Sequence, residues 1–448
     1  MLLKSIFYLS VFALIFTLFA FALPDAHAAT VTAVISGDWN AGATWSSGLV
    51  PADADDKIIE AGFTVTVSTL VSNSANINNQ GTIDITSAGT IANPGGTITN
   101  SGSITNSGTL ADTGGTITNS GSITNNLTGH INNNFGTITL NSPLSIITNN
   151  GIIANNDIIT ITSGTINNNL SGTILNNLGG TINNNDSITN SGTIQHIFPT
   201  ATYSGSGTLT GTGIIALLGT VSADKNLSTL GYPVNITNFS VTDPDFLNIN
   251  SGITLTIPSG YTLTNTGTIT NSGTIINTGT FTNNGIITVS NTGSSVGIQN
   301  SGGGTLTNNS GGIITVSNTG STIGIYNPSG TITNSGTITV SNTDGYGIYN
   351  DGTITNNSGG LITVSNSGVS SIGITNNLGT ITNTGTITVS NTGISTGISN
   401  GGTITNSGTI TVSNSDIQTI GISTLGTITN NSGGLITVSN TGYYGIRN

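Results

Sequence analysis

The tetrapeptide Thr-Val-Ser-Asn returns along the C-terminal half of this chain at nearly regular intervals. Shorter units repeat inside each interval: residues 331–350 contain Thr-Ile-Thr-Asn-Ser-Gly, Thr-Ile-Thr-Val-Ser-Asn and Gly-Ile-Tyr-Asn. Self-similarity at a fixed period is typical of a solenoid, in which each repeat packs only on its neighbours. The sequence therefore predicts stacked coils of about three short strands each. The tetrapeptide begins at seven positions separated by 23 to 27 residues, which are Thr288, Thr315, Thr339, Thr363, Thr388, Thr411 and Thr437.

Each short unit alternates apolar and hydroxylated residues with a period of two. Side chains alternate across a strand, so in Thr268-Ile269-Thr270 the Ile points to one face and both Thr point to the other. Coils stacked about 4.8 Å apart would align Ile in an internal column and Thr in external rows. We expect Gly and the Asn-Ser or Asn-Asn pairs at the corners, with Asn adopting left-handed backbone conformations and forming amide ladders between coils.

The predicted fold class is all-β, a parallel β-helix (β-solenoid). Parallel crossovers are overwhelmingly right-handed, and the long repeats suit a right-handed coil. The strict six-residue units between residues 261 and 289 would instead favour a left-handed β-helix. Low-complexity disorder is a further alternative for a chain rich in Gly, Ser and Asn, but disorder does not require Ile in phase with Thr over such a length. We therefore expect a right-handed solenoid with almost no helix after residue 30.

The first 28 residues have the pattern of a secretory signal peptide. Lys4 precedes an apolar run over residues 6–23, and Ala26-His27-Ala28 forms a small-x-small cleavage site. Cleavage after Ala28 would leave no transmembrane span, whereas an uncleaved membrane anchor is the alternative. The sequence predicts an exported protein of the extracellular space or the cell surface.

The charge balance limits the partners that the chain can take. The net charge is −12, only 4% of the residues are charged, and cysteine is absent. An exported protein without disulfides must be held together by packing and backbone pairing alone. Without a basic patch it cannot neutralise phosphates, so nucleic acid is excluded as a partner.

The rhythm of the repeats divides the mature chain into four segments. Residues 29–70 are not repetitive and contain both tryptophans, so we expect them to form an N-terminal cap, with Trp39 and Trp45 in its core. Residues 71–195 form a first solenoid run, residues 196–250 an irregular insert or joint, and residues 251–448 a second run with repeats of about 25 residues. The chain stops in mid-repeat at Asn448, which leaves two alternatives: a fragment, or an open last coil available for pairing.

Residues that could carry chemistry are few. Asp53, Asp55 and Asp56, with Glu60 and Lys57 nearby, form the only acidic cluster. We interpret this cluster as a solvated turn of the cap, with a calcium site as the weaker alternative. The pair Asp243 and Asp245 flanks Pro244 and is more typical of a turn than of catalysis. Two histidines, His130 and His196, lack metal-site spacing, so we expect neither a metal nor another cofactor.

Aromatic residues are the other candidates for contacts. Exposed tyrosines stack on sugar rings or anchor a partner protein, whereas packing within the coil is the alternative interpretation. The candidate contact residues recur at one place in the repeat, and they are Tyr326, Tyr346, Tyr349, Tyr443 and Tyr444.

The opening Trp39…Trp45…Pro51…Asp55-Asp56, followed by Gly-Thr-Ile-Thr-Asn-Ser-Gly repeats, resembles repeat-rich β-helical surface proteins of prokaryotes. These are the autotransporter passenger domains and the filamentous-haemagglutinin-like adhesins. The resemblance covers nearly the whole mature chain and implies a structural or adhesive role without catalysis. The implied partners are cell-surface glycans or proteins, or other copies of the chain. No C-terminal barrel of the autotransporter kind and no cell-wall anchor follows, so the resemblance leaves the secretion route and the mode of attachment open.

Two other functions fit part of the pattern. Rows of Thr-x-Thr on a flat β-face suit an ice-binding protein, although coils of unequal length should stagger the rows. Parallel β-helices also carry glycan-processing enzymes, whose sites need clustered carboxylates such as Asp53, Asp56, Asp243 and Asp245.

Overall fold

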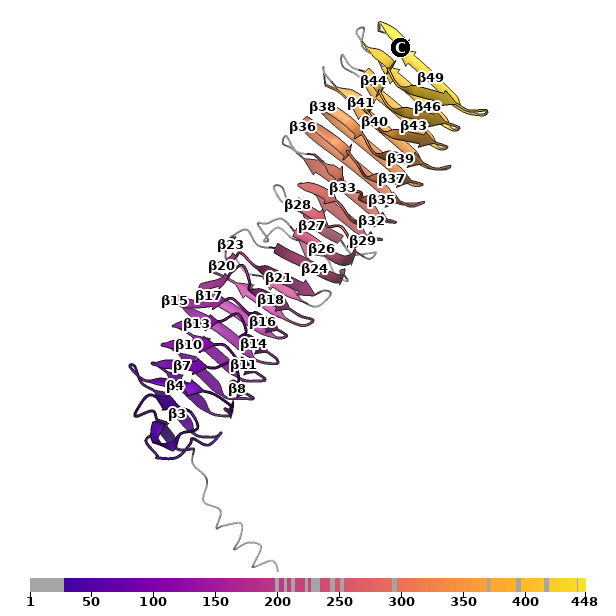
Figure 1. Ribbon diagram of the computed structural model, residues 1–448. Helices are drawn as coiled ribbons and strands as arrows, with labels where there is room; N and C mark the ends of the chain where they lie inside the picture. Colours follow the sequence, from indigo (N-terminus) through magenta and orange to yellow (C-terminus); the bar gives the residue numbers. More distant parts are fainter. Residues whose placement is uncertain are drawn as a thin grey trace, which may run out of the picture. The chain divides into compact units, whose positions relative to one another are not determined.

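The computed structural model describes residues 28–197, 201–204, 208–210, 214–221, 225–226, 234–241, 246–249, 254–291, 296–368, 371–391, 396–414, 419–440 and 442–448 (Figure 1). The predicted signal peptide up to His27 lies outside these residues, as do Asp243, Pro244 and Asp245. No helix among the described residues is long and apolar enough to cross a membrane. The chain divides into two compact units, Met1–Ile147 (unit 1) and Thr148–Asn448 (unit 2).

Unit 1 is a stack of coils in which three strands form each coil and every strand pairs in parallel with its equivalents in the neighbouring coils. The first ladder comprises β3 (Asp56–Ile59), β6 (Asn76–Asn79), β9 (Thr97–Asn100), β12 (Thr116–Asn119) and β15 (Thr137–Asn149). The second comprises β4 (Thr64–Val67), β7 (Thr82–Ile85), β10 (Ser103–Asn106) and β13 (Ser122–Asn125). The third comprises β5 (Leu70–Ser72), β8 (Thr90–Asn93), β11 (Thr109–Asp112) and β14 (His130–Asn133).

The predicted cap is partly built from strands of the same sheets. β1 (Thr30–Thr32) pairs in parallel with β3, and β2 (Gly37–Asp38) pairs with β4; a 3-10 helix, η1 (Gly42–Thr44), follows. Both tryptophans are buried, as predicted: the ring centroids of Trp39 and Trp45 lie 5.0 Å apart, and Trp45 Nε1 donates to the carbonyl of Trp39 at 2.8 Å. The two indoles therefore fill the end of the stack.

Unit 2 repeats the three-strand coil, and from residue 254 onward its three faces differ in sequence. The threonine face comprises β29 (Thr262–Asn265), β32 (Thr280–Asn283), β35 (Thr305–Asn308), β37 (Thr331–Asn334), β39 (Thr353–Asn356), β42 (Thr380–Asn383), β45 (Thr403–Asn406) and β48 (Thr427–Asn430). The valine face comprises β30 (Thr268–Asn271), β33 (Ile286–Asn291), β40 (Leu361–Asn366), β43 (Thr386–Asn391), β46 (Thr409–Asn414), β49 (Leu435–Asn440) and the first parts of β36 (Ile313–Asn327) and β38 (Thr337–Asn350). The tyrosine face comprises β28 (Thr254–Ile257), β31 (Thr274–Asn277), β34 (Ile298–Asn300), β41 (Ile372–Asn376), β44 (Thr396–Asn400), β47 (Ile420–Thr424), β50 (Tyr444–Arg447) and the last parts of β36 and β38.

The described strands before residue 254 also pair in parallel. Within the predicted irregular segment, β24 pairs with β21 on one side and β26 on the other, with a register shift between Leu217 and Gly219. The boundaries of that segment stay a prediction, as does the right-handed winding. These strands are β16 (Ile152–Asn155), β17 (Ile158–Asn168), β18 (Thr173–Asn176), β19 (Thr181–Asn184), β20 (Ser187–Asn190), β21 (Thr193–Ile197), β22 (Thr202–Ser204), β23 (Thr208–Thr210), β24 (Ile214–Val221), β25 (Lys225–Asn226), β26 (Val234–Val241) and β27 (Phe246–Ile249).

The period of two places Ile inside and Thr outside, as predicted. In β39, Thr353 and Thr355 are half-buried while Ile354 is only 2% exposed, and the same alternation recurs from coil to coil. Ile354 pairs in register with Ile332 below and Ile381 above, so the apolar column is continuous. Burial of one such side chain contributes about 1.5–3 kcal/mol, which makes the column the main source of stability in each unit.

The position predicted for asparagine is wrong in one respect. The Asn that ends each strand lies inside the coil: Asn334, Asn356 and Asn383 are fully buried. It continues the alternation of the strand and does not occupy a left-handed corner, because positive φ among the described residues belongs to glycines such as Gly359 (φ 83°) and to Phe135 (φ 62°). In the strands of the threonine face, asparagine completes the inward-facing pair of positions.

The predicted amide ladders are present, and they run through the interior. On the threonine face each Asn Nδ2 donates to the Oδ1 of the next Asn at 2.7–2.8 Å, without interruption from Asn265 to Asn430. Asn356 Nδ2 also lies 3.1 Å from the carbonyl oxygens of Gly360 and Thr386. The ladder thereby satisfies buried polar groups that would otherwise cost about 1–3 kcal/mol each. A second ladder on the tyrosine face runs through Asn277, Asn300, Asn327, Asn350, Asn376 and Asn400.

We predict that Asn356→Ala destabilises unit 2 by about 2–4 kcal/mol, because it leaves two buried ladder partners, Asn334 Nδ2 and Asn383 Oδ1, without their amide. The neighbouring variant Thr355→Ala removes an outward-facing side chain and should change stability by less than about 0.5 kcal/mol. Urea denaturation followed by circular dichroism measures both. Equal stability of the two variants would show that the ladder contributes nothing.

Glycine in the Gly-Ile-x-Asn unit makes room for valine in the Thr-Val-Ser-Asn unit. A Cβ placed on Gly373 would collide with Val389 Cγ1 and would lie 2.7 Å from the carbonyl oxygen of Gly397. The same approach recurs between Gly347 and Val364, Gly397 and Val412, and Gly421 and Val438. The two repeated motifs therefore share a contact that links the valine face to the tyrosine face.

Gly373→Ala should destabilise the chain by about 1–3 kcal/mol, because the added methyl overpacks this contact. Combination with Val389→Ala should recover part of the loss, so the two changes are expected to be less than additive. Gly95→Ala is the matched control, since a Cβ at Gly95 would meet no atom within 4 Å. A fully additive double variant would argue against the contact.

A histidine takes one place in an asparagine ladder of unit 2. Asn176 lies in register with His196, and its Nδ2 is 3.2 Å from His196 Nδ1; the next residue in the column is Leu217. His196 is 3% exposed, and burial lowers its pKa from 6.5 to about 4. The ring is therefore neutral in the folded chain at pH 7.

This pKa shift predicts a loss of stability in acid. Between about pH 6.5 and pH 4 the unfolded chain binds a proton that the folded chain does not, so stability falls as the pH falls, by about 2–3 kcal/mol at pH 4.5. His196→Asn, which restores the common ladder residue, should remove this dependence, whereas His130→Asn on the surface should keep it. Urea midpoints at pH 7 and pH 4.5 test the difference, and an unchanged dependence in His196→Asn would refute it.

Candidate functional site

Three tyrosines meet on the tyrosine face of unit 2, and we call Tyr326, Tyr346 and Tyr349 the tyrosine cluster. Tyr326 and Tyr349 are register partners on β36 and β38, with ring centroids 5.6 Å apart and planes at 71°. Tyr346 lies 5.3 Å from Tyr349 at 87°. Edge-to-face pairs at such distances stabilise one another by about 0.5–1.5 kcal/mol, so the three rings form one preorganised group.

A local departure from the period of two brings Tyr346 and Tyr349 to the same surface. Gly347 and Ile348 are both buried, so the outward positions are three residues apart and not two. The glycine that admits the valine contact therefore also sets the spacing of the two tyrosines. All three rings of the cluster are half-buried, with their remaining surface open to solvent.

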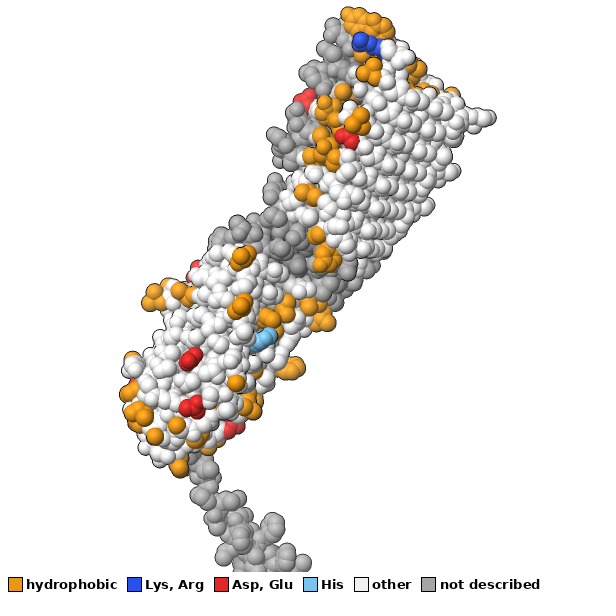
Figure 2. Space-filling view, in the orientation of Figure 1, with side chains coloured by type: hydrophobic (Ala, Val, Ile, Leu, Met, Phe, Trp, Pro, Cys, Tyr) orange, Lys and Arg blue, Asp and Glu red, His pale blue; other side chains and the backbone are white. Residues whose placement is uncertain are grey.

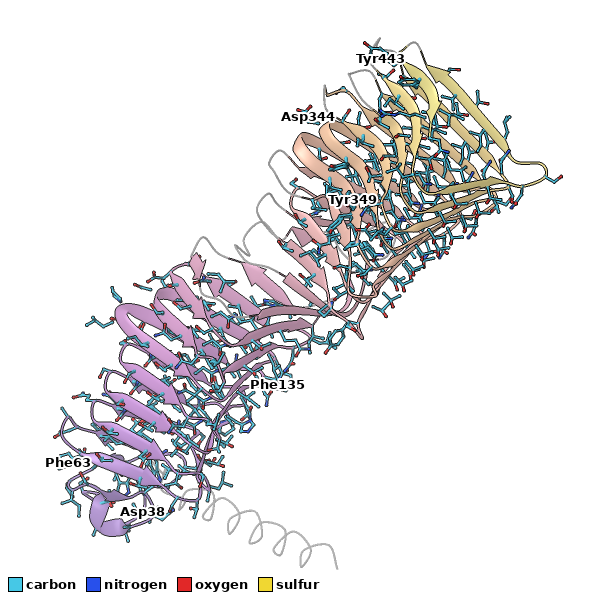
Figure 3. All side chains as sticks on the ribbon, turned by 45° about the horizontal axis from the view of Figure 1, so that its top comes forward. Asp38, Phe63, Phe135, Asp344, Tyr349 and Tyr443 are labelled. Atoms are coloured by element: carbon cyan, nitrogen blue, oxygen red, sulfur yellow. The ribbon has the colours of Figure 1, made fainter. Side chains whose placement is uncertain are left out.

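One acidic side chain, that of Asp351, lies beside the cluster. Burial, followed by the nearby charge of Asp351, raises the pKa of Tyr349, so its hydroxyl keeps its proton at neutral pH. The Asp351 carboxylate accepts from Asn377 Nδ2 at 3.0 Å and from the Leu378 amide at 3.2 Å, which fixes its position. Asp344 and Tyr349 are labelled in Figure 3, and Figure 2 shows hydrophobic and acidic side chains together on this otherwise uncharged part of unit 2.

The other predicted tyrosines form a separate pair. Tyr443 and Tyr444 are 69% and 51% exposed, their rings stack at 6.3 Å, and the Arg447 guanidinium lies 5.9 Å from the Tyr444 centroid. Tyr444 belongs to the same column as Tyr346, through Ile372, Thr396 and Ile420. Four strand spacings of about 4.8 Å put the two groups about 19 Å apart, so the five predicted tyrosines share one face in two clusters.

The carboxylates of the acidic cluster at the start of unit 1 accept hydrogen bonds from the chain around them. Asp55 accepts from the amides of Ala29 and Ala52, Asp53 from the amide of Ser74, and Asp56 from the amide and side chain of Asn76. Among the described residues, no group of three or more His, Cys, Asp or Glu side chains is placed to hold a metal ion. The carboxylates hold the chain together around the first coils.

Lys57 explains why acids gather there, and its role was not evident from the sequence. It is 1% exposed, and its Nζ donates to the carbonyl of Asp53 at 2.6 Å and to Asn73 Oδ1 at 2.9 Å. Burial lowers the pKa of Lys57, while Asp53, Asp55 and Asp56 act in the opposite direction. The ammonium thus caps the ladder that continues from Asn73 to Asn93. The inward position of Lys57 in the alternation of β3 was the available signal.

Comparisons with known proteins add little to the fold assignment that the strand pairing already supports. No protein-family model matches the chain, and no curated protein matches its sequence. Among solved structures, a TibC-catalysed, hyper-glycosylated TibA fragment aligns over 92% of this chain and 92% of that chain, with 16% identity and a TM-score of 0.20. Because superposition at that score is poor, the β-solenoid assignment rests on the register of this chain.

Proposed function

We propose that this chain is an exported structural or adhesive β-solenoid of the cell surface, without catalytic activity, that contacts a glycan through the tyrosine cluster. The main support for this proposal is the preorganised group of Tyr326, Tyr346 and Tyr349 in a chain with only 5% aromatic residues. The remainder of the chain supplies a scaffold in which each coil pairs with the next.

The chemistry of the cluster favours a sugar as the ligand. Phenol rings offer apolar faces for the C–H side of a pyranose, and protonated hydroxyls donate to its oxygens. The Asp351 carboxylate, held beside Tyr349, accepts from sugar hydroxyls. A protein partner or a second copy of the chain would use the same rings, but would also bury a larger area around them.

Export follows from the signal-peptide pattern of residues 1–28. The absence of cysteine from all 448 residues suits a scaffold stabilised by its ladders and apolar columns in any redox environment. Asp53, Asp55 and Asp56 already accept hydrogen bonds from the chain, which favours a structural role for these acids over glycan hydrolysis.

Glycan binding by the mature chain, residues 29–448, tests the proposal. We expect Tyr349→Ala and Tyr326→Ala to weaken binding to the best ligand on a glycan array by about five- to thirtyfold each, the effect of losing about 1–2 kcal/mol. Tyr261→Ala, at a 40% exposed tyrosine outside the cluster, is the control. Binding that survives both cluster variants, or a folded chain that binds no glycan, would contradict the proposed contact.

A further inference from the structure

The outward side chains of the threonine face form a two-column array that the tyrosine cluster does not use. All sixteen outward positions on its eight strands are threonine, and each is exposed or half-buried. We call these residues the threonine array. Its columns are Thr262, Thr280, Thr305, Thr331, Thr353, Thr380, Thr403 and Thr427, and Thr264, Thr282, Thr307, Thr333, Thr355, Thr382, Thr405 and Thr429.

Unequal coil length does not stagger these rows, contrary to the expectation from the sequence. Successive coils differ between 18 and 27 residues along this face, yet Thr pairs with Thr at all seven steps. The difference in length falls between the strands. The pairing therefore yields a regular lattice of side chains from an irregular repeat.

The buried side chains behind the threonines hold the array in place. Behind each pair of threonines except the last lies one buried apolar side chain, such as Ile354, and one rung of the amide ladder, such as Asn356. Sheets of many strands stay flat where side-chain ladders hold them, and this ladder runs the whole length of the array. Threonine itself is β-branched, so its rotamers are few and little freedom is lost when the hydroxyl is held in place.

The surface of the array is chemically uniform. The eight strands contain no charged residue, and their outward positions carry only methyl and hydroxyl groups. Figure 2 shows a broad part of the surface of unit 2 on which white atoms, which are backbone and uncharged polar side chains, lie in regular rows. The valine face is less uniform, since one of its outward columns mixes Thr with Ile286, Ile313, Leu361 and Leu435.

The spacing of the array suits a target that repeats in two dimensions. Equivalent threonines lie about 4.8 Å apart across the strands and about 6.6 Å apart along each strand. Water oxygens on the prism faces of hexagonal ice repeat at comparable distances in both directions. A soluble glycan has no such two-dimensional repeat. Recognition of a protein surface would require charge or shape complementarity, and this uniform face offers neither.

We propose that the threonine array binds ice. The hydroxyls hold water in the lattice positions that the strand spacing sets, and the methyl groups between them exclude other arrangements. Eight strands at about 4.8 Å give a contact about 34 Å long. Because the array and the tyrosine cluster lie on different faces of the coil, this binding is independent of the adhesive role.

Thermal hysteresis and partition of the mature chain into slowly growing ice are the measurements. The double variant Thr333→Tyr and Thr355→Tyr places two bulky rings in the middle of the array and should lose most of both activities. Thr363→Tyr is the control, because it carries one such change on the valine face of the coil that holds Thr355. Circular dichroism establishes that each variant is folded.

Each outcome of these measurements either supports the proposal or overturns it. Ice activity in the wild type and in Thr363→Tyr, with loss in the double variant, supports the proposal. A folded wild-type chain without thermal hysteresis and without enrichment in ice overturns it, as does equal loss in both variants. Retention on crystalline chitin or cellulose without ice activity overturns it as well and assigns the array to a crystalline polysaccharide. Glycan-array binding reports on the tyrosine cluster alone, so the two functions can fail separately.

Discussion

The in-register parallel pairing of one coil with the next is the constraint on which this protein depends. A single coil buries too few apolar side chains to be stable, and only the repetition of the same residue at the same place makes a core. Asparagine enforces this register more strictly than isoleucine does. An apolar side chain tolerates a small slip, but a buried amide must meet the next amide or leave a polar group unsatisfied. The ladder from Asn265 to Asn430 thus specifies alignment as well as contributing to stability.

Much of this arrangement follows from the sequence, because the alternation of the strands is visible in it. The three-strand coil, the inward isoleucines, the outward threonines and the buried tryptophans were all predicted, since each depends on local periodicity and hydropathy. Positions that depend on contacts between coils were not. The inward asparagines look like corner residues because their polarity suggests exposure, and only the partner in the next coil makes their burial possible. Lys57 escaped notice for the same reason: its partners, Asp53 and Asn73, come together only when the coils stack.

The candidate sites show the same division between local and long-range information. The five tyrosines were identified from their recurrence in the repeat, but the meeting of Tyr326, Tyr346 and Tyr349 depends on strand register and on the buried pair Gly347-Ile348. Unequal repeat lengths suggested staggered threonine rows, because spacing along the chain was taken as spacing in the structure. Pairing between strands sets the rows instead, and the segments between the strands take up the difference.

The amide ladders have a direction, since each rung donates toward the C-terminal coil and accepts from the coil before it. Every interior coil therefore presents to the coil that follows it the same interface that the preceding coil presents to it. A tandem duplication of one complete repeat in the coding sequence would add a layer that fits between its neighbours without any compensating substitution. The length of such a molecule, and with it the number of threonine rows and the reach of the tyrosines, is a copy number that recombination can adjust one layer at a time.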